Sequence, residues 1–311
     1  MSNRLLLGVG PSPDTGGGGG FIGDNLLLED GYNFLLEDGD HLYLENEAFD
    51  PVYDSDAQAY MTAVENADGQ ELESGVKEAI NTFVLGCKSD GIWDAIKASC
   101  ILAGARTLSG AIQPLVGTAP TNYNFVGGDY NRKTGLVGDG ATKYLDSNRA
   151  SNDDPEDDLH FSVYVSDAGT ITTNRSHIAT RYTIGAADFN GIQAVNDGRL
   201  VIWNRNGDAL SPPNLFASPA GNSLGLLATT RSVSNAFDMR FGGNNYTATG
   251  LTATSYAPSA VNYLCFARNA VPVSFFSDSR LSFYSIGEAL DLALLDSRVS
   301  TLISQIGAAI P

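Results

Sequence analysis

The stretch HFSVYVS, residues 160–166, determines the fold class that the sequence predicts. Phe161, Val163 and Val165 occupy alternate positions, so in an extended strand their side chains lie on the same face. A period of two is typical of a strand that buries one face. We therefore predict that this stretch is a β-strand with one side against a core.

The same pattern recurs on both sides of this stretch, between residues 121 and 284. Short runs rich in β-branched and aromatic residues are separated by Gly and Asn. The runs are HIATRYTI (177–184), GIQAV (191–195), RLVIWN (199–204), LGLLATTRS (224–232), FDMRFGG (237–243), NNYTATG (244–250), NYLCFAR (262–268) and RLSFYSI (280–286). No helices alternate with them, which favours an antiparallel arrangement. We predict a mainly β protein with an antiparallel β-sandwich over residues 118–284.

Helical patterns flank the sandwich and predict a helical module over residues 51–117 and a C-terminal helix over 285–311. Three capping-box patterns, beginning at Ser55, Asp68 and Ser285, predict helix starts. The apolar positions are Tyr60, Ala63, Val64 and Ala67; then Leu72, Val76, Ala79, Ile80, Phe83, Val84 and Cys87; then Ile92, Trp93, Ile96 and Cys100 in a third helical segment; and Leu295, Val299, Leu302 and Ile306. These stripes most simply pack against a core.

The front of the chain differs from the rest. A Gly- and Pro-rich arm, residues 1–24, precedes three octads, NLLLEDGYNFLLEDGDHLYLENE (25–47), within a segment spanning 25–50. Each octad predicts a very short strand, and these strands bury too little to be stable alone. Nine large side chains need a partner surface: Leu26, Leu27, Leu28, Phe34, Leu35, Leu36, Leu42, Tyr43 and Leu44. We predict an assembly segment; the alternative is edge strands on the chain's own sandwich.

Charge and cysteine content exclude several classes of protein. Acidic residues outnumber basic ones by 36 to 18, so the chain repels nucleic acid, and no nucleic acid partner is expected. No apolar run is long enough for a signal peptide or a membrane span, so we expect no membrane insertion. Cys87, Cys100 and Cys265 lack metal-site spacing and are expected to be buried thiols of a protein made in the cytosol.

Two resemblances add to this interpretation. The hairpin GRLVIWNRNG (198–207) and the ending SDSRLSFYSIGEALDLALLDSRV (277–299) resemble the concanavalin-type, laminin-G-like jelly-roll sandwich. The chain also resembles a virion structural protein of tailed bacteriophages. This second resemblance covers the LLLEDG repeats, residues 56–117 and residues 122–149 taken together. The second resemblance implies a protein that is assembled in the host bacterial cytoplasm and localised in the virion. Its partners would be other virion proteins and further copies of the chain, with a trimer favoured.

The sequence offers no catalytic constellation. Glycoside hydrolases on the concanavalin-type fold carry the pattern Glu-x-Asp-x-(x)-Glu on one strand, and no predicted strand of this chain has it. His41, His160 and His177 are scattered, without a nucleophile motif around them. We predict that the chain is not an enzyme.

Two binding sites are nevertheless candidates. The stretch SNDDPEDD (151–158) would offer calcium the carboxylates of Asp153, Asp154, Glu156, Asp157 and Asp158, although such a loop is more often simply solvated. No other cofactor is expected.

A host surface glycan would need an exposed aromatic ring beside amides. Tyr246 with Asn244 and Asn245 is the best candidate. Trp203 beside Asn204 is weaker, because its alternation with Val201 favours burial.

These observations support one leading hypothesis. The chain is a virion structural protein exposed on the particle, most simply a tail-fibre, tail-tip or other adhesion component with a lectin-like sandwich. The alternative is a head decoration, or cement, protein of the capsid. A glycan-active enzyme and a free cytosolic binding module are further alternatives, of which the first lacks its carboxylates and the second leaves the octads unexplained.

Overall fold

The computed structural model describes residues 52–170, 173–180, 189–195, 199–206, 224–250 and 254–311. Its helices and strands belong to one compact unit, Tyr53–Pro311. The predicted arm and the octad segment, including the nine assembly residues, lie outside the described residues.

Helices and strands are each numbered in chain order. The helices are α1 (Ser55–Asp68), α2 (Ser74–Ser89), α3 (Leu108–Ala111) and α4 (Leu292–Ala309). The strands are β1 (Ile96–Ile101), β2 (Thr121–Tyr123), β3 (Tyr130–Asn131), β4 (Gly135–Val137), β5 (Tyr144–Ala150), β6 (Leu159–Asp167), β7 (Arg175–Ala179), β8 (Phe189–Ala194), β9 (Leu200–Asn206), β10 (Gly225–Val233), β11 (Ala236–Phe241), β12 (Asn244–Thr249), β13 (Asn262–Cys265) and β14 (Arg280–Gly287).

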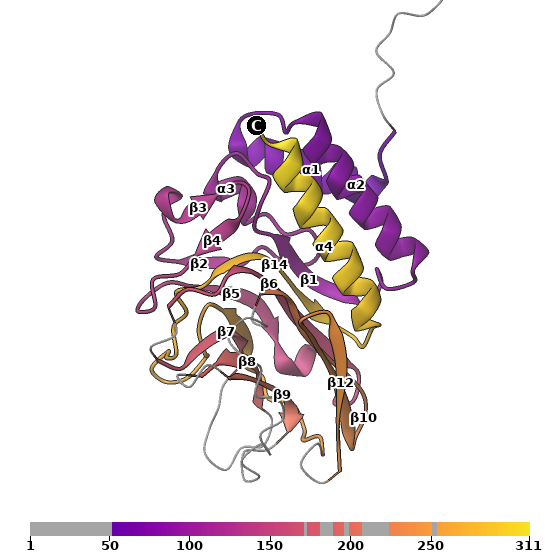
Figure 1. Ribbon diagram of the computed structural model, residues 1–311, viewed down its shortest axis with the longest axis vertical. Coiled ribbons are helices and arrows are strands. Elements are labelled where there is room, and N and C mark those ends of the chain that lie inside the picture. The colour runs from indigo at the N-terminus through magenta and orange to yellow at the C-terminus, as the bar shows by residue number, and fades with distance from the viewer. Residues whose placement is uncertain (1–51, 171–172, 181–188, 196–198, 207–223, 251–253) are drawn as a thin grey trace, which may run out of the picture. The chain divides into compact units, whose positions relative to one another are not determined.

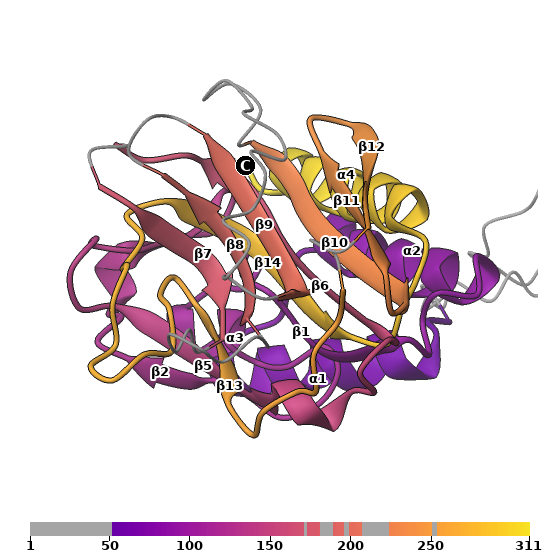
Figure 2. The ribbon, with the colours of Figure 1, turned by 90° about the horizontal axis from the view of Figure 1, so that it is seen from below.

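The strands form two antiparallel sheets. The eight-stranded sheet has the order β12-β11-β10-β6-β14-β4-β3, with β1 also paired to β14. The six-stranded sheet has the order β2-β5-β13-β7-β8-β9. Figure 2 shows β7, β8 and β9 of this second sheet side by side. The prediction of a mainly β, antiparallel sandwich is confirmed.

The core between the two sheets is built by the alternation that the sequence predicted. Phe161, Val163 and Val165 of β6 are fully buried there. They meet residues of the facing sheet, and the rings of Phe161 and Tyr263 are 5.4 Å apart between centroids. These apolar side chains fix the register of β6, because a slip of one residue would turn them away from the core between the sheets and place Ser162 and Tyr164 there instead.

Helices α1, α2 and α4 form a layer on the outer face of the eight-stranded sheet, away from β7, β8 and β9 (Figure 1). A second core lies beneath them. Phe83 of α2 meets Phe283 of β14 edge to face, with ring centroids 5.8 Å apart. The predicted apolar stripe of α4, including Leu295, Val299 and Ile306, is buried in this core.

One predicted helix is wrong. Residues 96–101 form β1, which pairs with β14 and makes the helical module continuous with the sandwich. Ile96 and Ile101 are buried in the core under the helices, whereas Cys100 is buried in the core between the sheets. A strand covered on both faces shows no alternation, and the spacing of Ile92, Ile96 and Cys100 then imitates a helix.

The predicted helix starts are also displaced. Asp54, rather than Ser55, caps α1 and accepts a hydrogen bond from the Asp56 amide at 3.0 Å. Asp68 ends α1 instead of starting α2. Ser285 lies within β14, and α4 begins only after its cap at Asp291. A capping-box pattern alone does not distinguish such positions from true caps.

Cys87, Cys100 and Cys265 are buried free thiols, as predicted. Burial raises the pKa of the Cys87 and Cys100 thiols to about 12, which keeps them protonated. Among the described residues, no helix is both long enough and apolar enough to cross a membrane.

Candidate functional site

The outward face of the six-stranded sheet carries an aromatic surface near its β2 edge. Leu145 of β5 is fully buried in the core, so its neighbours Tyr144 and Asp146 point to the opposite face. Edge strand β2 pairs with β5 so that Tyr123 lies directly opposite Tyr144, and Thr121 opposite Asp146. The register therefore brings together side chains that are distant in the sequence.

The two tyrosines stack on one another. Their ring centroids are 4.3 Å apart and their planes differ by 9°. Tyr123 remains 40% exposed. Phe276 continues the row beyond Tyr144, at 6.2 Å between ring centroids. We call Tyr123, Tyr144, Phe276, Asp146 and Asn148 the tyrosine surface.

Polar groups beside the rings are held in place by the strand itself. Asn148 has a φ of 55°, a left-handed conformation that Asn tolerates better than most residues. This bend brings the Asn148 amide to Asp146 Oδ1 at 2.9 Å. Asn148 Nδ2 donates across to Thr121 Oγ1 at 3.0 Å, which ties β5 to the edge strand.

Asp146 is held in place by hydrogen bonds and not by a cation. Both of its hydrogen bonds are accepted by Oδ1, from the Asn148 amide and from Asn262 Nδ2, each at 2.9 Å. It forms no ion pair with any residue that the structure describes. The nearby ammonium of Lys143 is bound to Asp129 at 2.6 Å. Burial, followed by the charges of Tyr123 and Asp146, raises the pKa of Tyr144.

A surface of this kind can hold a sugar. The C–H face of a pyranose packs on an aromatic ring, and carboxylate and amide groups at the ring edge fix its hydroxyls. At this edge, paired strands hold both an exposed aromatic ring and the carboxylate and amide groups beside it.

Little in the sequence indicates this surface. β2 is only three residues long, and β5 (YLDSNRA) lacks the β-branched residues that mark a strand. Tyr123 and Tyr144 become neighbours only through the β2–β5 register. The tyrosines themselves are the available signal, but without the register nothing separates them from ordinary loop residues.

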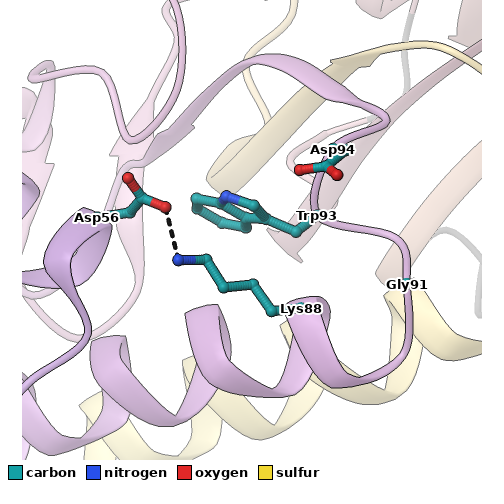
Figure 3. Close-up of a pocket in the computed structure, with 5 residues that line it drawn as sticks. All are labelled: Asp56, Lys88, Gly91, Trp93 and Asp94. Carbon is teal, nitrogen blue, oxygen red and sulfur yellow. Dashed lines mark ion pairs between the residues drawn. The ribbon is translucent and has the colours of Figure 1, made fainter.

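A second candidate is a pocket at the junction of α1, α2 and the loop that follows α2 (Figure 3). It has a volume of about 360 Å³ and is lined by Asp56, Lys88, Gly91, Trp93 and Asp94. The Asp56 and Asp94 carboxylates lie toward opposite ends of the Trp93 indole (Figure 3).

The lysine of this pocket is already paired. Lys88 Nζ lies 2.7 Å from carboxylate oxygens of both Asp54 and Asp56, and 5.7 Å from the centre of the Trp93 ring. The hydrogen bonds that Lys88 donates to Asp54 and then to Asp56 raise its pKa. This arrangement fastens the start of α1 to the end of α2. We therefore assign the pocket mainly to holding the helices together.

The predicted calcium ligands do not converge on one point. The Asp154 carboxylate is buried and binds Arg149 through Nε at 3.0 Å and Nη2 at 2.5 Å. Asp153, Glu156 and Asp158 accept hydrogen bonds from Ala150 N, Ser255 Oγ and Ala289 N, respectively. Asp157 Oδ1 is buried without a partner. In the described part of the chain, no group of three or more His, Cys, Asp or Glu residues could hold a metal ion.

The backbone oxygens of the same loop are also occupied. The fully buried Arg205 donates to the carbonyl oxygens of Ser151, Asp154 and Pro155. The Arg205 guanidinium therefore already uses the carbonyl oxygens that could bind a metal ion. Its hydrogen bonds also hold the loop against the sandwich. Burial lowers the pKa of Arg205.

The predicted glycan residues lie together on the β11–β12 hairpin. Tyr246 is partly buried, and its ring stacks on Phe241 at 4.3 Å between centroids. The exposed Asn245 accepts a hydrogen bond from Arg240 at 2.7 Å, and Asn244 donates to the Gly242 carbonyl at 2.9 Å. The ring of Tyr246 is thus less available than that of Tyr123.

Trp203 departs from the expectation of burial. Its neighbour Ile202 points into the core, so Trp203 lies on the outward face and is only partly buried. It contacts Phe189, with ring centroids 4.9 Å apart. The alternation correctly predicts that Val201 and Trp203 share one face of the strand, but that face points away from the core.

His160 and Ser285 are neighbours, but they do not form an accessible catalytic pair. His160 Nε2 lies 3.0 Å from Ser285 Oγ, and both residues are fully buried. His160 Nδ1 donates to the Glu288 carbonyl at 2.5 Å. The pair links β6 to the end of β14.

Neither a protein-family model nor a curated protein matches this chain. Solved structures with a partial likeness include a K499G mutant of the NanB sialidase from Streptococcus pneumoniae. It is 12% identical over 53% of this chain, with a TM-score of 0.40. The match spans only 27% of the sialidase chain.

Two smaller domains show a similar partial likeness. The CBM40 of the Ruminococcus gnavus IT-sialidase is 13% identical, with 49% of this chain and 84% of that chain covered and a TM-score of 0.34. Domain 4 of AbnA, a GH43 extracellular arabinanase from Geobacillus stearothermophilus, is 12% identical. That match covers 63% of this chain and 83% of the domain, with a TM-score of 0.36.

Proposed function

We propose that this protein is a glycan-binding structural component of a tailed-bacteriophage particle, and that the tyrosine surface is its binding site. The observation that carries the binding part is the exposed Tyr123 ring, stacked on Tyr144 beside Asp146. A stacked pair presents a rigid aromatic platform at low entropic cost, because each ring already restrains the other.

The tyrosine surface suits adhesion rather than catalysis. Both rings belong to paired strands, so the platform is preorganised. Asp146, the acid beside the rings, is held by two hydrogen bonds on one oxygen. Most glycoside hydrolases use a pair of carboxylates about 5–10 Å apart across the scissile bond, and Asp146 is the one carboxylate of the tyrosine surface. We therefore expect binding without release of reducing ends.

The virion part of the proposal rests on the sequence resemblance. Within it, a tail-fibre or tail-tip position is favoured, because an exposed glycan-binding surface has an evident use there. The octads would then be the assembly segment that joins the chain to its own copies or to another virion protein. A head decoration protein is the alternative, and immunogold labelling of intact particles with antibodies against residues 121–300 decides between head and tail. Absence of the label from intact particles would refute the virion assignment.

Binding is tested by matched tyrosine variants. Tyr123→Ala removes the exposed ring, whereas Tyr256→Ala removes a tyrosine of almost equal exposure, 39%, outside the tyrosine surface. We expect the first variant to lower the affinity for host surface polysaccharide by about tenfold or more, since a well-packed aromatic contact contributes about 1–2 kcal/mol. The second should bind like the unmodified chain. Equal binding by all three proteins would refute the assignment of the site.

A further inference from the structure

If the tyrosine surface is the binding site proposed above, its charged groups influence which glycans can bind there. Asp146 Oδ1 accepts both of the hydrogen bonds that the residue forms, which leaves Oδ2 without a described protein donor. This oxygen can accept a hydroxyl or an ammonium from a ligand. It repels a carboxylate.

The neighbouring charges do not offset Asp146. Lys143 is paired with Asp129 at 2.6 Å, and Asp139, which also precedes β5, binds the amides of Ala141, Thr142 and Lys143. These amides, together with the Thr142 hydroxyl, hold the pKa of Asp139 below its usual range despite burial, so it stays ionised.

The cation on β5 itself is also paired. Arg149, the residue after Asn148, binds the Asp154 carboxylate, with Nη2 2.5 Å from Oδ1. Neither Lys143 nor Arg149 is therefore placed to offset the charge of Asp146 or to bind a sugar carboxylate at this edge.

We propose that the tyrosine surface selects polysaccharides whose sugars are uncharged or carry amines, and that Asp146 rejects sugars bearing a carboxylate. Stacking on Tyr123 provides affinity for any pyranose face. The unpaired carboxylate at the edge of the rings then distinguishes ligands by charge. Asp146 is in this sense a specificity-determining residue.

The test uses the full chain and a matched pair of polymers. A neutral bacterial surface polysaccharide that binds is compared with the same polymer after oxidation of its primary hydroxyls to carboxylates. We expect about fivefold weaker binding of the oxidised polymer at low salt, because like charges a few ångströms apart repel even in a water-like medium. The difference should shrink at about 1 M salt, where screening acts over about 3 Å.

Variants assign this discrimination to one residue. Asp146→Asn removes the charge but keeps an oxygen acceptor, and we expect the ratio of the two affinities to approach one. Glu78→Gln removes the same charge from the exposed surface of α2, in the helical layer on the other sheet, and should leave the ratio at its original value.

Two results would overturn the proposal. One is tighter or equal binding of the oxidised polymer, and the other is full discrimination that persists in Asp146→Asn. If carboxylated polymers bind and Tyr123→Ala abolishes that binding, only the charge selection fails. If no polysaccharide of either kind binds, the glycan-binding function fails with it.

Discussion

His160 and His177 are buried as neutral imidazoles, and this makes the fold sensitive to acid. Burial lowers the pKa of His160 to about 4 and that of His177 to about 3, although the hydrogen bond to the Glu288 carbonyl partly opposes the shift of His160. In the unfolded chain both would titrate near about 6.5. Because the pKa is lower in the folded state, their contribution to stability is fully present above about pH 6.5, and it is lost as the pH falls to about 4 for His160 and about 3 for His177.

We therefore expect the free energy of unfolding to fall below about pH 6.5, by up to about 1.4 kcal/mol per pH unit for each histidine. Urea unfolding at half-unit intervals from pH 7.5 to 4.5 measures this slope. A His177→Gln variant should show a shallower slope, whatever its absolute stability. An identical slope in the variant would mean that His177 does not titrate on unfolding.

At the level of single residues, the sequence predicts burial better than function. The apolar side chains of β6 and α4 are identified by their periodicity, since burial leaves a regular pattern. Tyr123 and Tyr144 are not, because their partnership depends on how two strands pair. The prediction for Trp203 is wrong, since alternation identifies two faces without telling which is the core.

At the level of elements, α4 depends on its N-terminal cap. The Asp291 carboxylate accepts hydrogen bonds from the amides of Ala293 and Leu294, at 2.7 and 3.0 Å. We expect Asp291→Ala to lower the free energy of unfolding by about 1 kcal/mol, as other caps do. Asp94→Ala is the control, because this exposed carboxylate forms no hydrogen bond or ion pair with any described residue. Thermal melts that rank the two variants equally would contradict the role of the cap.

The loop at 151–158 supports a prediction about calcium. Arg205 and Arg149 already supply positive charge to its carbonyl oxygens and to Asp154. We expect millimolar calcium to leave the melting temperature unchanged relative to a chelator. A calcium-dependent rise that Asp157→Asn abolishes would instead establish the metal site and show that the loop rearranges to form it.

Among the elements, the longer strands with a clear alternation of apolar residues are predictable from the sequence, even where both of their faces are buried, as in β14. The predicted positions of the alternating strands β6, β10 and β14 agree with the structure within a few residues. β1 imitates a helix, because it lies between two cores and carries apolar side chains toward both. The short strands β2, β3 and β4 escape prediction, since two or three residues carry too little pattern to detect.

At the level of the whole molecule, the compact unit Tyr53–Pro311 should fold without the residues before it. A chain beginning at Asp54 keeps the α1 cap and the ion pair with Lys88. We expect it to melt at the temperature of the full chain but to lose self-association or incorporation into particles, because the octads are removed. Light scattering and particle incorporation measure this. A truncated chain that keeps both properties would contradict an assembly role for residues 25–47.

Tyrosine-selective NMR of the full chain can show whether the stacked tyrosines contact a glycan. The chain contains 13 tyrosines, whose ring signals can be assigned by single substitutions. When fragments of a bound polysaccharide are added, we expect the ring signals of Tyr123 and Tyr144 to shift with the binding curve while that of Tyr256 stays in place. Saturable binding that leaves the Tyr123 and Tyr144 signals unchanged would show that the glycan binds elsewhere on the protein.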